Sequence, residues 1–390
     1  MPYPLISDYI SSIRAAEDNF DKLSHLRPVM DADGNPVMSS GNFAVVFKMS
    51  DGAKYYALKC FLREQEGRDE AYRMIAEELE YVSSPYLTNV EYHDKELFVD
   101  SKNCTETEFP VLLMDWVEGM TLDRYIRENI GDADCLKMLA YRFSKLATWL
   151  LTQSFAHGDI KPDNILVTSD GSLVLVDYDG MYVPAMSGRR SRELGSPDYR
   201  HPLRTEDDFN DHIDDFSLAS IALSLKALSL DALLLDRYGA ADRLLFSASD
   251  YQDLSHCEAL RSIASLLADE ELARLYALFL IAHSTKNLSS VSFRLFDMKK
   301  PKEKTKEYRF EVRNRMSVRA LMEQQNADID IIPSKKNPGK LFFSCGSIVG
   351  YITQEAAKAP AKQLQYAECR RDGSTEWVPC ILRIPKNNKS

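Results

Sequence analysis

The stretch FAHGDIKPDNILV, residues Phe155 to Val167, places an aspartate and an asparagine five residues apart with a lysine between them. An apolar, strand-like run follows directly behind the asparagine. Asp159, Lys161 and Asn164 therefore combine a carboxylate, an ammonium and an amide on one short segment. Each of these alone is most simply a polar group on a surface loop. Together they are candidates for a reaction site, and the flanking sequence has to supply its remaining parts.

Four segments before this stretch have regular patterns. Residues 4–23 repeat apolar side chains at helical spacing, residues 41–61 form two alternating runs around a Ser-Asp-Gly turn, residues 70–82 return to helical spacing, and residues 109–117 are apolar. These patterns predict an amphipathic helix, a β-hairpin, a second helix and a buried strand. Helical patterns dominate after residue 120. Strands first and helices later indicate an α+β protein with two lobes.

Phosphoryl transfer from ATP needs a cradle for the phosphates, a cation against them, ligands for a metal ion and a carboxylate that orients the attacking hydroxyl. The chain has candidates for all of these parts: SSGNFAVV at 39–46, YYALKCF at 55–61, HGDIKPDN at 157–164 and LVDYDG at 175–180. They resemble the Gly-rich loop, V-A-I-K strand, H-R-D loop and D-F-G segment of the eukaryotic-like protein kinase superfamily. The resemblance covers about Val37 to Ile281. Within that superfamily, SGNFA, VDYDGMYVPA and HIDDFSL are similar to a divergent bacterial group of Ser/Thr kinase-like proteins.

The resemblance implies a role for each polar residue of these segments. Asp159 would orient the substrate hydroxyl and accept its proton, and Lys161 would neutralise charge on the γ-phosphate. Lys59 would pair with the α- and β-phosphates. Asn164 and Asp177 would hold Mg²⁺, which prefers hard oxygen ligands. ATP and Mg²⁺ are therefore the expected cofactors.

A nucleotide pocket is implied by the same resemblance. The segment LLMDWVEG, residues 112–119, resembles the connection between the lobes, with Met114 as gatekeeper and the main chain of Asp115 and Val117 facing adenine. A core strand that ends in a turn is the simpler alternative for this segment. The residues expected to bind ATP are Gly41, Asn42, Phe43, Val46, Ala57, Lys59, Met114, Asp115 and Val117.

Two further segments concern the substrate. GSPDYRHP, residues 195–202, resembles the end of the activation segment, where Ser196, Pro197 and Tyr199 would form a shelf for a peptide substrate. DDFSLA, residues 214–219, resembles the start of the buried central helix. Small-molecule kinases of the aminoglycoside and choline type share the H-G-D beginning and a second acid such as Asp179, but they lack these two segments. A protein substrate is therefore expected.

The chain also departs from the family pattern. Gly41 alone remains of three loop glycines, so the loop should approach the phosphates less closely. Gly158 replaces an arginine that would pair with a phosphorylated activation loop, and Leu203 replaces the glutamate of A-P-E. The helix glutamate that should pair with Lys59 has no clear counterpart. Glu78 is the predicted partner, because it lies nearest to the inward face of its helix.

Charge divides the chain near residue 300. The net charge is −11, yet residues 297–390 carry 19 Lys and Arg against 11 Asp and Glu, so the acidic excess lies in the first 296 residues. The run KKPKEKTKE, residues 299–307, is typical of a solvated linker. The sequence predicts an N-terminal helical extension at 1–30, a kinase N-lobe at 31–115, a kinase C-lobe at 116–297, a Lys-rich linker at 298–307 and a module at 308–390.

The basic tail contains alternating runs that predict strands, the second pair turning at Asp372 and Gly373. The whole chain is therefore expected to be a two-lobed, protein-kinase-like α+β fold followed by a small β-rich module. The favoured role for this module is to recruit a protein partner or to dock on the acidic region, with nucleic-acid binding as the alternative. Seven scattered cysteines without a C-x-x-C pair indicate reduced thiols and a cytoplasmic location. No membrane span is predicted, because Lys226 and Asp231 interrupt the longest apolar run.

Three functions remain open at this level. The favoured one is an ATP- and Mg²⁺-dependent Ser/Thr protein kinase, indicated by Lys161 two residues after Asp159 and by Ser196 in the shelf. The alternatives are a small-molecule kinase of the aminoglycoside or choline type and a catalytically silent ATP-binding scaffold. The complete set of catalytic and metal-binding candidates argues against silence.

Overall fold

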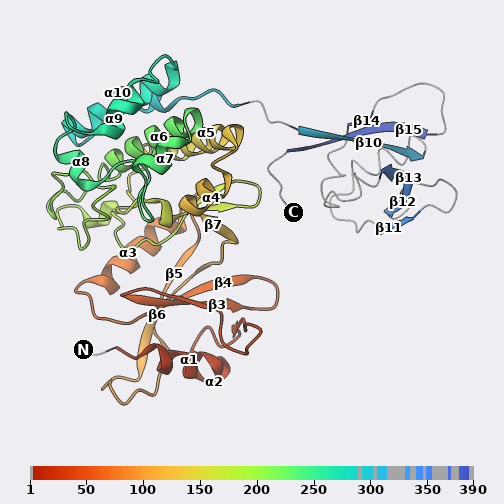
Figure 1. Cartoon of the computed structure of the whole chain (residues 1–390). Helices are drawn as coiled ribbons and strands as arrows, with labels where there is room; N and C mark the ends of the chain where they lie inside the picture. Colours follow the sequence, from red (N-terminus) through yellow and green to blue (C-terminus); the bar gives the residue numbers. More distant parts are fainter. Residues whose placement is uncertain are drawn as a thin grey trace. The chain divides into compact units, whose positions relative to one another are not determined.

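A computed structural model describes residues 3–288, 292–301, 305–313, 330–333, 340–345, 348–353, 368–369 and 377–385. The chain divides into two compact units, Met1–Lys300 and Pro301–Ser390. All the residues predicted to bind ATP, metal or substrate belong to the first unit. Figure 1 shows that this unit has a strand-rich part near the N-terminus and a helical part that follows it in the chain.

An antiparallel sheet forms the body of the smaller lobe, with strand order β1-β3-β4-β6-β5 and β2 paired to β3. Its strands are β1 (Arg27–Pro28), β2 (Met38–Ser40), β3 (Ala44–Ser50), β4 (Tyr55–Phe61), β5 (Val90–Phe98) and β6 (Glu108–Asp115). Strands β3 and β4 are the predicted hairpin. Val45, Phe47 and Met49 of β3 are buried at every second position, because alternate side chains of a strand share one face.

Two short helices, α1 (Ile6–Arg14) and α2 (Ala16–Asn19), pack against this sheet near the N-terminus. The sequence predicted a single helix here. Ala15 leaves the helical conformation, with φ −105° and ψ 43°, so the chain turns and Phe20 bridges to Leu97 of β5. The hydroxyl of Tyr9 in α1 donates to the carbonyl oxygen of Phe61 at 2.7 Å. The extension is thus built into the lobe.

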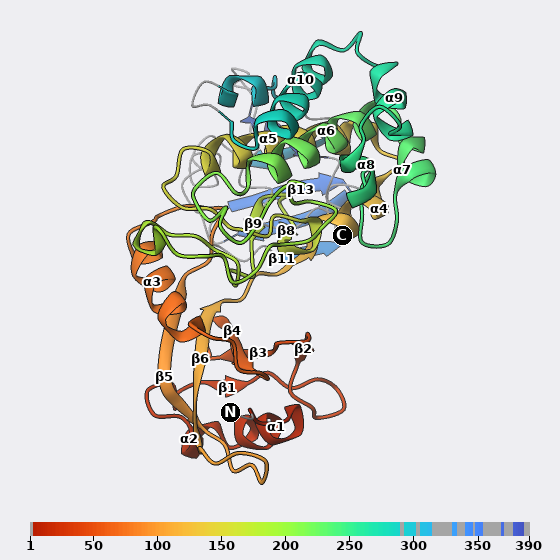
Figure 2. The ribbon, with the colours of Figure 1, turned by 90° about the vertical axis from the view of Figure 1, so that its left-hand side faces the viewer.

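Helix α3 (Arg68–Glu80) packs beside β5, near the junction of the two lobes (Figures 1 and 2). Its buried residues Ala71, Tyr72, Ile75 and Leu79 recur at helical spacing, as the sequence pattern predicted. This face of α3 contributes to the larger of the two hydrophobic cores, the one that continues into the helical lobe. The helix is therefore anchored to both lobes.

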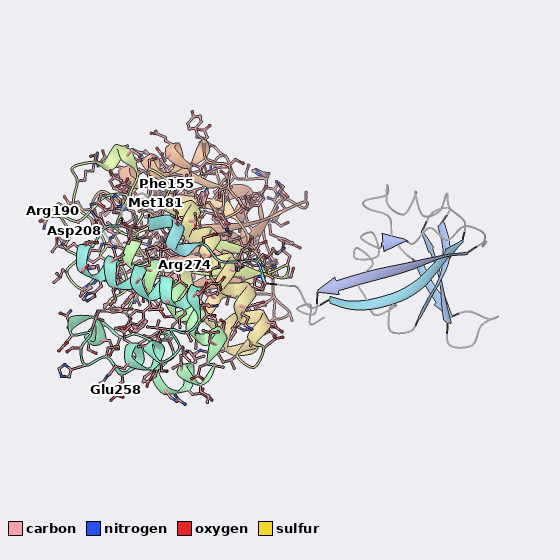
Figure 3. The ribbon with its side chains drawn as sticks, turned by 90° about the horizontal axis from the view of Figure 1, so that it is seen from above. Phe155, Met181, Arg190, Asp208, Glu258 and Arg274 are labelled. Carbon is pink, nitrogen blue, oxygen red and sulfur yellow. The ribbon has the colours of Figure 1, made fainter. Side chains whose placement is uncertain are left out.

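The larger lobe is mainly helical and begins after β6. Its elements are β7 (Gly119–Thr121), α4 (Leu122–Asn129), α5 (Ala133–Leu150), η1 (Pro162–Asn164), β8 (Ile165–Thr168), β9 (Leu173–Leu175), η2 (Pro184–Met186), α6 (Asp215–Leu230), α7 (Leu233–Tyr238), α8 (Ala248–Gln252), α9 (Glu258–Ala264), α10 (Glu270–Thr285) and η3 (Ser292–Phe296). Strands β7, β8 and β9 form a small sheet next to η1. Figure 3 labels Phe155 and Met181, which are almost fully buried in this lobe.

Helix α6 lies at the centre of the larger lobe, packed against α5 and α10. All of its residues from Asp215 to Ser229 are buried, which explains an apolar run that could be mistaken for a membrane span. Its one lysine, Lys226, is compensated by Asp269 at 3.0 Å and Glu271 at 2.9 Å. Among the described residues, no helix combines the length and the apolar character needed to cross a bilayer.

The second unit contains an antiparallel sheet with strand order β11-β12-β13-β10-β15-β14. Its strands are β10 (Thr305–Arg313), β11 (Asp330–Pro333), β12 (Lys340–Cys345), β13 (Ile348–Thr353), β14 (Glu368–Cys369) and β15 (Trp377–Pro385). The β-rich module predicted after the kinase-like lobes is therefore observed. The turn that the sequence predicts at Asp372 and Gly373 lies outside the described residues.

The linker predicted at 298–307 is shorter in the structure. Met298 is buried, and the main-chain N–H of Lys299 donates to Glu271 at 2.9 Å, so the first residues of this segment belong to the larger lobe. At the other end, Thr305 already pairs with Pro385 as the start of β10. The lysine-rich composition suggested a solvated segment, but main-chain hydrogen bonds draw both of its ends into folded structure.

Candidate active site

The loop between α5 and β8 brings together the three polar residues of the opening stretch. The Asp159 carboxylate accepts the main-chain N–H of Ser196 at 2.7 Å through Oδ1. Its Oδ2 lies 2.9 Å from Nζ of Lys161 and accepts Nδ2 of Asn164 at 3.1 Å. Burial would lower the pKa of Lys161, but the surrounding carboxylates, Asp159 first among them, raise it overall. The Asp159 carboxylate is thus held in one orientation by three donors.

A buried carboxylate at the start of α6 holds this loop from behind. Asp214 accepts the main-chain N–H groups of His157 and Gly158, the latter at 2.8 Å. Burial raises the pKa of the Asp214 carboxyl. His157 also contacts the carbonyl oxygen of Val176 through Nε2 at 3.0 Å, which ties the loop to the segment that carries Asp177. Asp214 therefore holds the loop that carries Asp159 through its main chain.

Gly158 occupies a position that only glycine can fill in this fold. Its φ is +85°, and a Cβ built there would lie 1.9 Å from the carbonyl oxygen of Gly180. The arginine that the family has at this position could not be accommodated. Instead, the buried guanidinium of Arg204 donates through Nη1 to the carbonyl oxygen of Gly158 at 2.9 Å and lies 3.5 Å from that of Glu193. Arg204 thereby joins the loop that carries Asp159 to the segment that carries Glu193.

Lys59 on β4 meets the segment after β9 across the two lobes. Its Nζ lies 2.8 Å from Oδ1 of Asp177 and 2.5 Å from Oδ1 of Asp179. Burial would lower the pKa of Lys59, but the two carboxylates outweigh it and raise the pKa. Burial would also raise the pKa of Asp177, yet the nearby ammonium lowers it overall. Both groups are therefore held in their charged forms.

Asp177 has a strained main chain, with φ of +68°. A non-glycine residue in this left-handed region costs about 1–3 kcal/mol and persists where the surroundings hold it in place. Here the N–H of the preceding Val176 donates to the carbonyl oxygen of Asn164 at 2.9 Å, and Lys59 binds the side chain. The contacts on both sides account for a conformation that the sequence alone does not favour.

The sequence predicted Glu78 as the partner of Lys59, and the structure shows a different contact for its side chain. Its carboxylate accepts the hydroxyl of Ser154 at 3.4 Å instead. The residue of α3 that reaches Lys59 is Tyr72, whose hydroxyl lies 3.5 Å from Nζ. The physical reason is the orientation of α3 about its own axis. Ile75 is buried in the core, so Tyr72, about one turn earlier, faces Lys59. Glu78 then points to a different neighbour.

The strand register places the predicted nucleotide-binding residues along one part of the smaller lobe. Val46 is paired with Lys59 between β3 and β4, and Ala57 is paired with Met114 between β4 and β6. The β2–β3 turn contains Gly41, Asn42 and Phe43, and the N–H of Gly41 donates to the carbonyl oxygen of Ala44 at 2.9 Å. Asp115 ends β6, and Val117 follows in the connection to the larger lobe.

The predicted substrate shelf is folded onto the catalytic loop, though not with all three side chains at the surface. The main-chain N–H of Ser196 donates a hydrogen bond to the Asp159 carboxylate, and Pro197 is exposed. Tyr199 is 4% exposed, its hydroxyl accepts the N–H of Leu244 at 3.1 Å, and its carbonyl oxygen accepts the hydroxyl of Ser217 at 2.8 Å. Tyr199 therefore supports the shelf from inside and does not offer its ring to a substrate.

The donor set suits a hard divalent cation that is shared with a phosphate ligand. Asn164 uses its amide nitrogen on Asp159, which leaves the carbonyl oxygen Oδ1 as the atom that could serve a cation. Within the described part of the chain, no group of three or more His, Cys, Asp and Glu side chains is placed to hold a metal. Mg²⁺ is usually held by one or two carboxylates together with substrate phosphates, so Asn164 and Asp177 fit that ion.

The arrangement of a β-rich lobe, a helical lobe and a lysine–aspartate pair between them defines a class of phosphotransferase, and sequence comparison identifies its family. Residues 35–230 match the family described as the protein kinase domain, and the chain belongs to this family. This confirms the two-lobed kinase fold. Membership of the divergent bacterial group stays a prediction.

Similarity to individual kinases is modest. The chain is 26% identical over 204 residues to the citron rho-interacting kinase of Rattus norvegicus, covering 49% of this chain and 9% of that protein. It is 25% identical over 173 residues to an Aurora kinase of Yarrowia lipolytica, covering 42% and 43%, and 29% identical over 156 residues to the serine/threonine-protein kinase cds1 of Schizosaccharomyces pombe, covering 36% and 31%. The chain thus spans less than half the length of these relatives.

Two residues of the site were not found from the sequence. Tyr72 looks like an ordinary core aromatic of an amphipathic helix, and Arg204 looks like an ordinary surface arginine after a proline. Leu203, aligned with the family's glutamate, is 64% exposed and carries no such contact, whereas its neighbour Arg204 is buried. No local pattern marks either residue, because the function of each arises from a contact with a distant segment.

Proposed function

We propose that this chain is an ATP- and Mg²⁺-dependent protein kinase that phosphorylates serine or threonine. The single observation that carries the proposal is the contact of Lys59 with Asp177 at 2.8 Å, which joins the two lobes beside Asp159. In this reading Lys59 binds the α- and β-phosphates and Lys161 the γ-phosphate. Asp159 orients the substrate hydroxyl and accepts its proton.

Mg²⁺ would be held by Asn164 and Asp177, and it would supply positive charge against the phosphate oxygens. The rest of the mechanism belongs to the chain itself. Ser196, Lys161 and Asn164 fix the Asp159 carboxylate through three hydrogen bonds or ion pairs. A general base in a fixed orientation avoids the entropy cost of finding the attacking hydroxyl.

The folded shelf favours a protein substrate over a small molecule. The main chain of Ser196 is bonded directly to Asp159, so an extended segment lying on Ser196 and the exposed Pro197 would bring its hydroxyl to the base. The direct test is transfer of labelled phosphate from ATP to generic protein substrates in the presence of Mg²⁺. Phosphoserine or phosphothreonine in the product is expected. Transfer to aminoglycosides or choline instead would contradict the proposal.

Reduced thiols at Cys60, Cys135 and Cys257 fit a cytoplasmic location.

Asp177→Ala is expected to abolish the stabilisation of the protein by ATP and Mg²⁺. ATP at a hundred times its Kd should stabilise the wild type by about 2.7 kcal/mol. The variant should lose most of this gain, because the triphosphate charge stays uncompensated. The measurement is the change in melting temperature on adding ATP and Mg²⁺ to each protein. Asp236→Ala, which removes an exposed carboxylate of α7, is the matched control and should respond like the wild type. An equal response in Asp177→Ala would contradict the metal assignment.

The kinase is expected to be active without phosphorylation of its activation segment. Gly158 leaves no arginine to read a phosphate at this position, and unmodified groups already hold the segment: Arg204 binds the Gly158 and Glu193 carbonyls, and Arg189 forms two 2.7 Å contacts with Glu70 of α3. Phosphatase treatment should therefore leave the rate unchanged.

A sharp loss of rate after phosphatase would refute this expectation. Arg204→Met serves as the comparison, because it removes the donor to the Gly158 and Glu193 carbonyls without adding or removing a phosphate site. Its rate should be reduced to the same level before and after phosphatase treatment.

A further inference from the structure

Helix α3 offers Lys59 no carboxylate among the described residues. Glu70 is taken by the guanidinium of Arg189, with both of its oxygens in contact at 2.7 Å. Glu78 accepts a hydrogen bond from Ser154. The contact from α3 that does reach Lys59 is a phenol hydroxyl, and a neutral hydroxyl does not compensate an ammonium charge. The charge balance of Lys59 must come from another element.

Two carboxylates from the segment after β9 provide that balance, and they differ in exposure. The Lys59 side chain is 8% exposed, Asp177 is 47% exposed and Asp179 is 16% exposed. A buried ammonium is costly unless a partner remains beside it. The exposed carboxylate is the one that solvent, a cation or a nucleotide can reach. The sheltered one can stay on the lysine.

Asp179 is itself held in place by the activation segment. The guanidinium of Arg192 donates through Nη2 to the carbonyl oxygen of Asp179 at 2.9 Å. On the other side, the following Gly180 packs against the main chain of Gly158, where even one methyl group would not fit. The position of Asp179 is therefore set by contacts within the larger lobe.

We propose that Asp179 is the residue that positions Lys59 when Asp177 turns to the nucleotide, taking over the role that a helix glutamate has elsewhere in this family. This inference rests on the proposed ATP-dependent function. As a consequence, the partner of the catalytic lysine would move together with the activation segment. Movement of α3 would then reach the Lys59 pair indirectly, through the contact of Glu70 with Arg189.

Asp179→Asn and Asp179→Glu form the primary test, because the first removes the charge and the second keeps it. Loss of one partner of a buried charge pair should weaken ATP binding in Asp179→Asn by about 10-fold or more, measured by calorimetry with Mg²⁺ present. Asp179→Glu should retain most of the affinity. Glu77→Gln removes an exposed carboxylate from α3 and should change nothing. Wild-type affinity in Asp179→Asn would overturn the proposal, as would its loss in Glu78→Gln.

A second readout does not require the nucleotide. Nucleotide-free Asp179→Asn should melt roughly 2–4 °C or more below Asp179→Glu, because the buried Lys59 ammonium loses its sheltered partner and keeps only the more exposed Asp177. Equal melting temperatures would overturn the proposal. If the wild type binds no ATP at all, the proposed function fails, whereas the melting comparison still decides whether Asp179 is a partner of Lys59.

Transfer of the carboxylate to α3 separates a positioning role from a merely structural one. In the Asp179→Asn background, Tyr72→Glu places an acid at the helix position that already lies 3.5 Å from Lys59. ATP affinity should return. A double variant that folds, as judged by circular dichroism, but does not recover ATP affinity would overturn the proposal. The comparison of Asp179→Asn with Asp179→Glu decides the matter independently of how well this buried site accepts glutamate.

Discussion

Replacing Asp159 with asparagine is expected to lower kcat by roughly 100- to 10,000-fold, the range attributed to a lost general base. The amide keeps the shape of the carboxylate and can still accept the main-chain N–H of Ser196, which bonds Oδ1 at 2.7 Å in the wild type. ATP affinity should stay within about twofold, because Asp159 acts on the hydroxyl in the transition state and not on the bound nucleotide. The measurement is steady-state phosphate transfer together with ATP titration.

The split between kcat and ATP affinity is what separates a kinase from a silent ATP-binding scaffold. A scaffold would show no transfer in the wild type, and Asp159→Asn would then change nothing. Asp163→Asn is the matched control, since it replaces an exposed carboxylate of the same loop. Its kcat should remain near that of the wild type. A fall in ATP affinity equal to the fall in kcat would show that Asp159 supports the fold of the site and would remove it as the base.

Gly158→Ala is expected to be strongly destabilising. The residue needs a left-handed main chain with φ of +85°, and the new Cβ would lie 1.9 Å from the carbonyl oxygen of Gly180. Strain and overpacking together should cost about 3 kcal/mol or more. At 2–4 °C per kcal/mol, that is a fall in melting temperature of roughly 6–12 °C. Activity should fall too, because Asp159 is the next residue.

Gly188→Ala isolates the contribution of the close contact. Gly188 has nearly the same φ, +80°, but nothing lies within 4 Å of its added Cβ. It should therefore show only the conformational cost of about 1–2 kcal/mol. Both variants are compared by thermal melting monitored by circular dichroism. Equal melting temperatures would contradict the claim that the approach of Gly180 reserves this position for glycine.

Several parts of the site follow from local sequence because they depend on residues close together in the chain. Asp159, Lys161 and Asn164 fall within six residues, so one loop brings them together whatever the rest of the fold does. The hairpin pattern around Ser50–Gly52 sets the strand register, and that register places Val46 beside Lys59. The apolar run of α6 likewise reveals a buried helix, although the sequence pattern does not say which helices surround it.

The sequence did not predict correctly which residue of α3 lies next to Lys59. Counting along α3 at 100° per residue identified the inward face, and the buried Ile75 and Leu79 lie on it. It did not show which point of that face meets Lys59, because the angle between helix and sheet is set by packing. The predicted partner Glu78 and the observed neighbour Tyr72 are six residues apart, about one and two-thirds turns of the helix, so they point in different directions.

The sequence by itself determined the family, the two-lobed fold and the chemical type of each candidate site residue, because motif order and spacing are properties of the chain. Only the tertiary structure decided the partners. Lys59 meets Asp177 across 118 residues and Asp179 across 120, and Arg204 reaches Gly158 across 46. Such contacts depend on how distant elements pack, and a periodic pattern within one element carries no record of them. For the same reason, the sequence shows Gly158 only as the replacement of an arginine. The structure shows that this position has no room for any side chain.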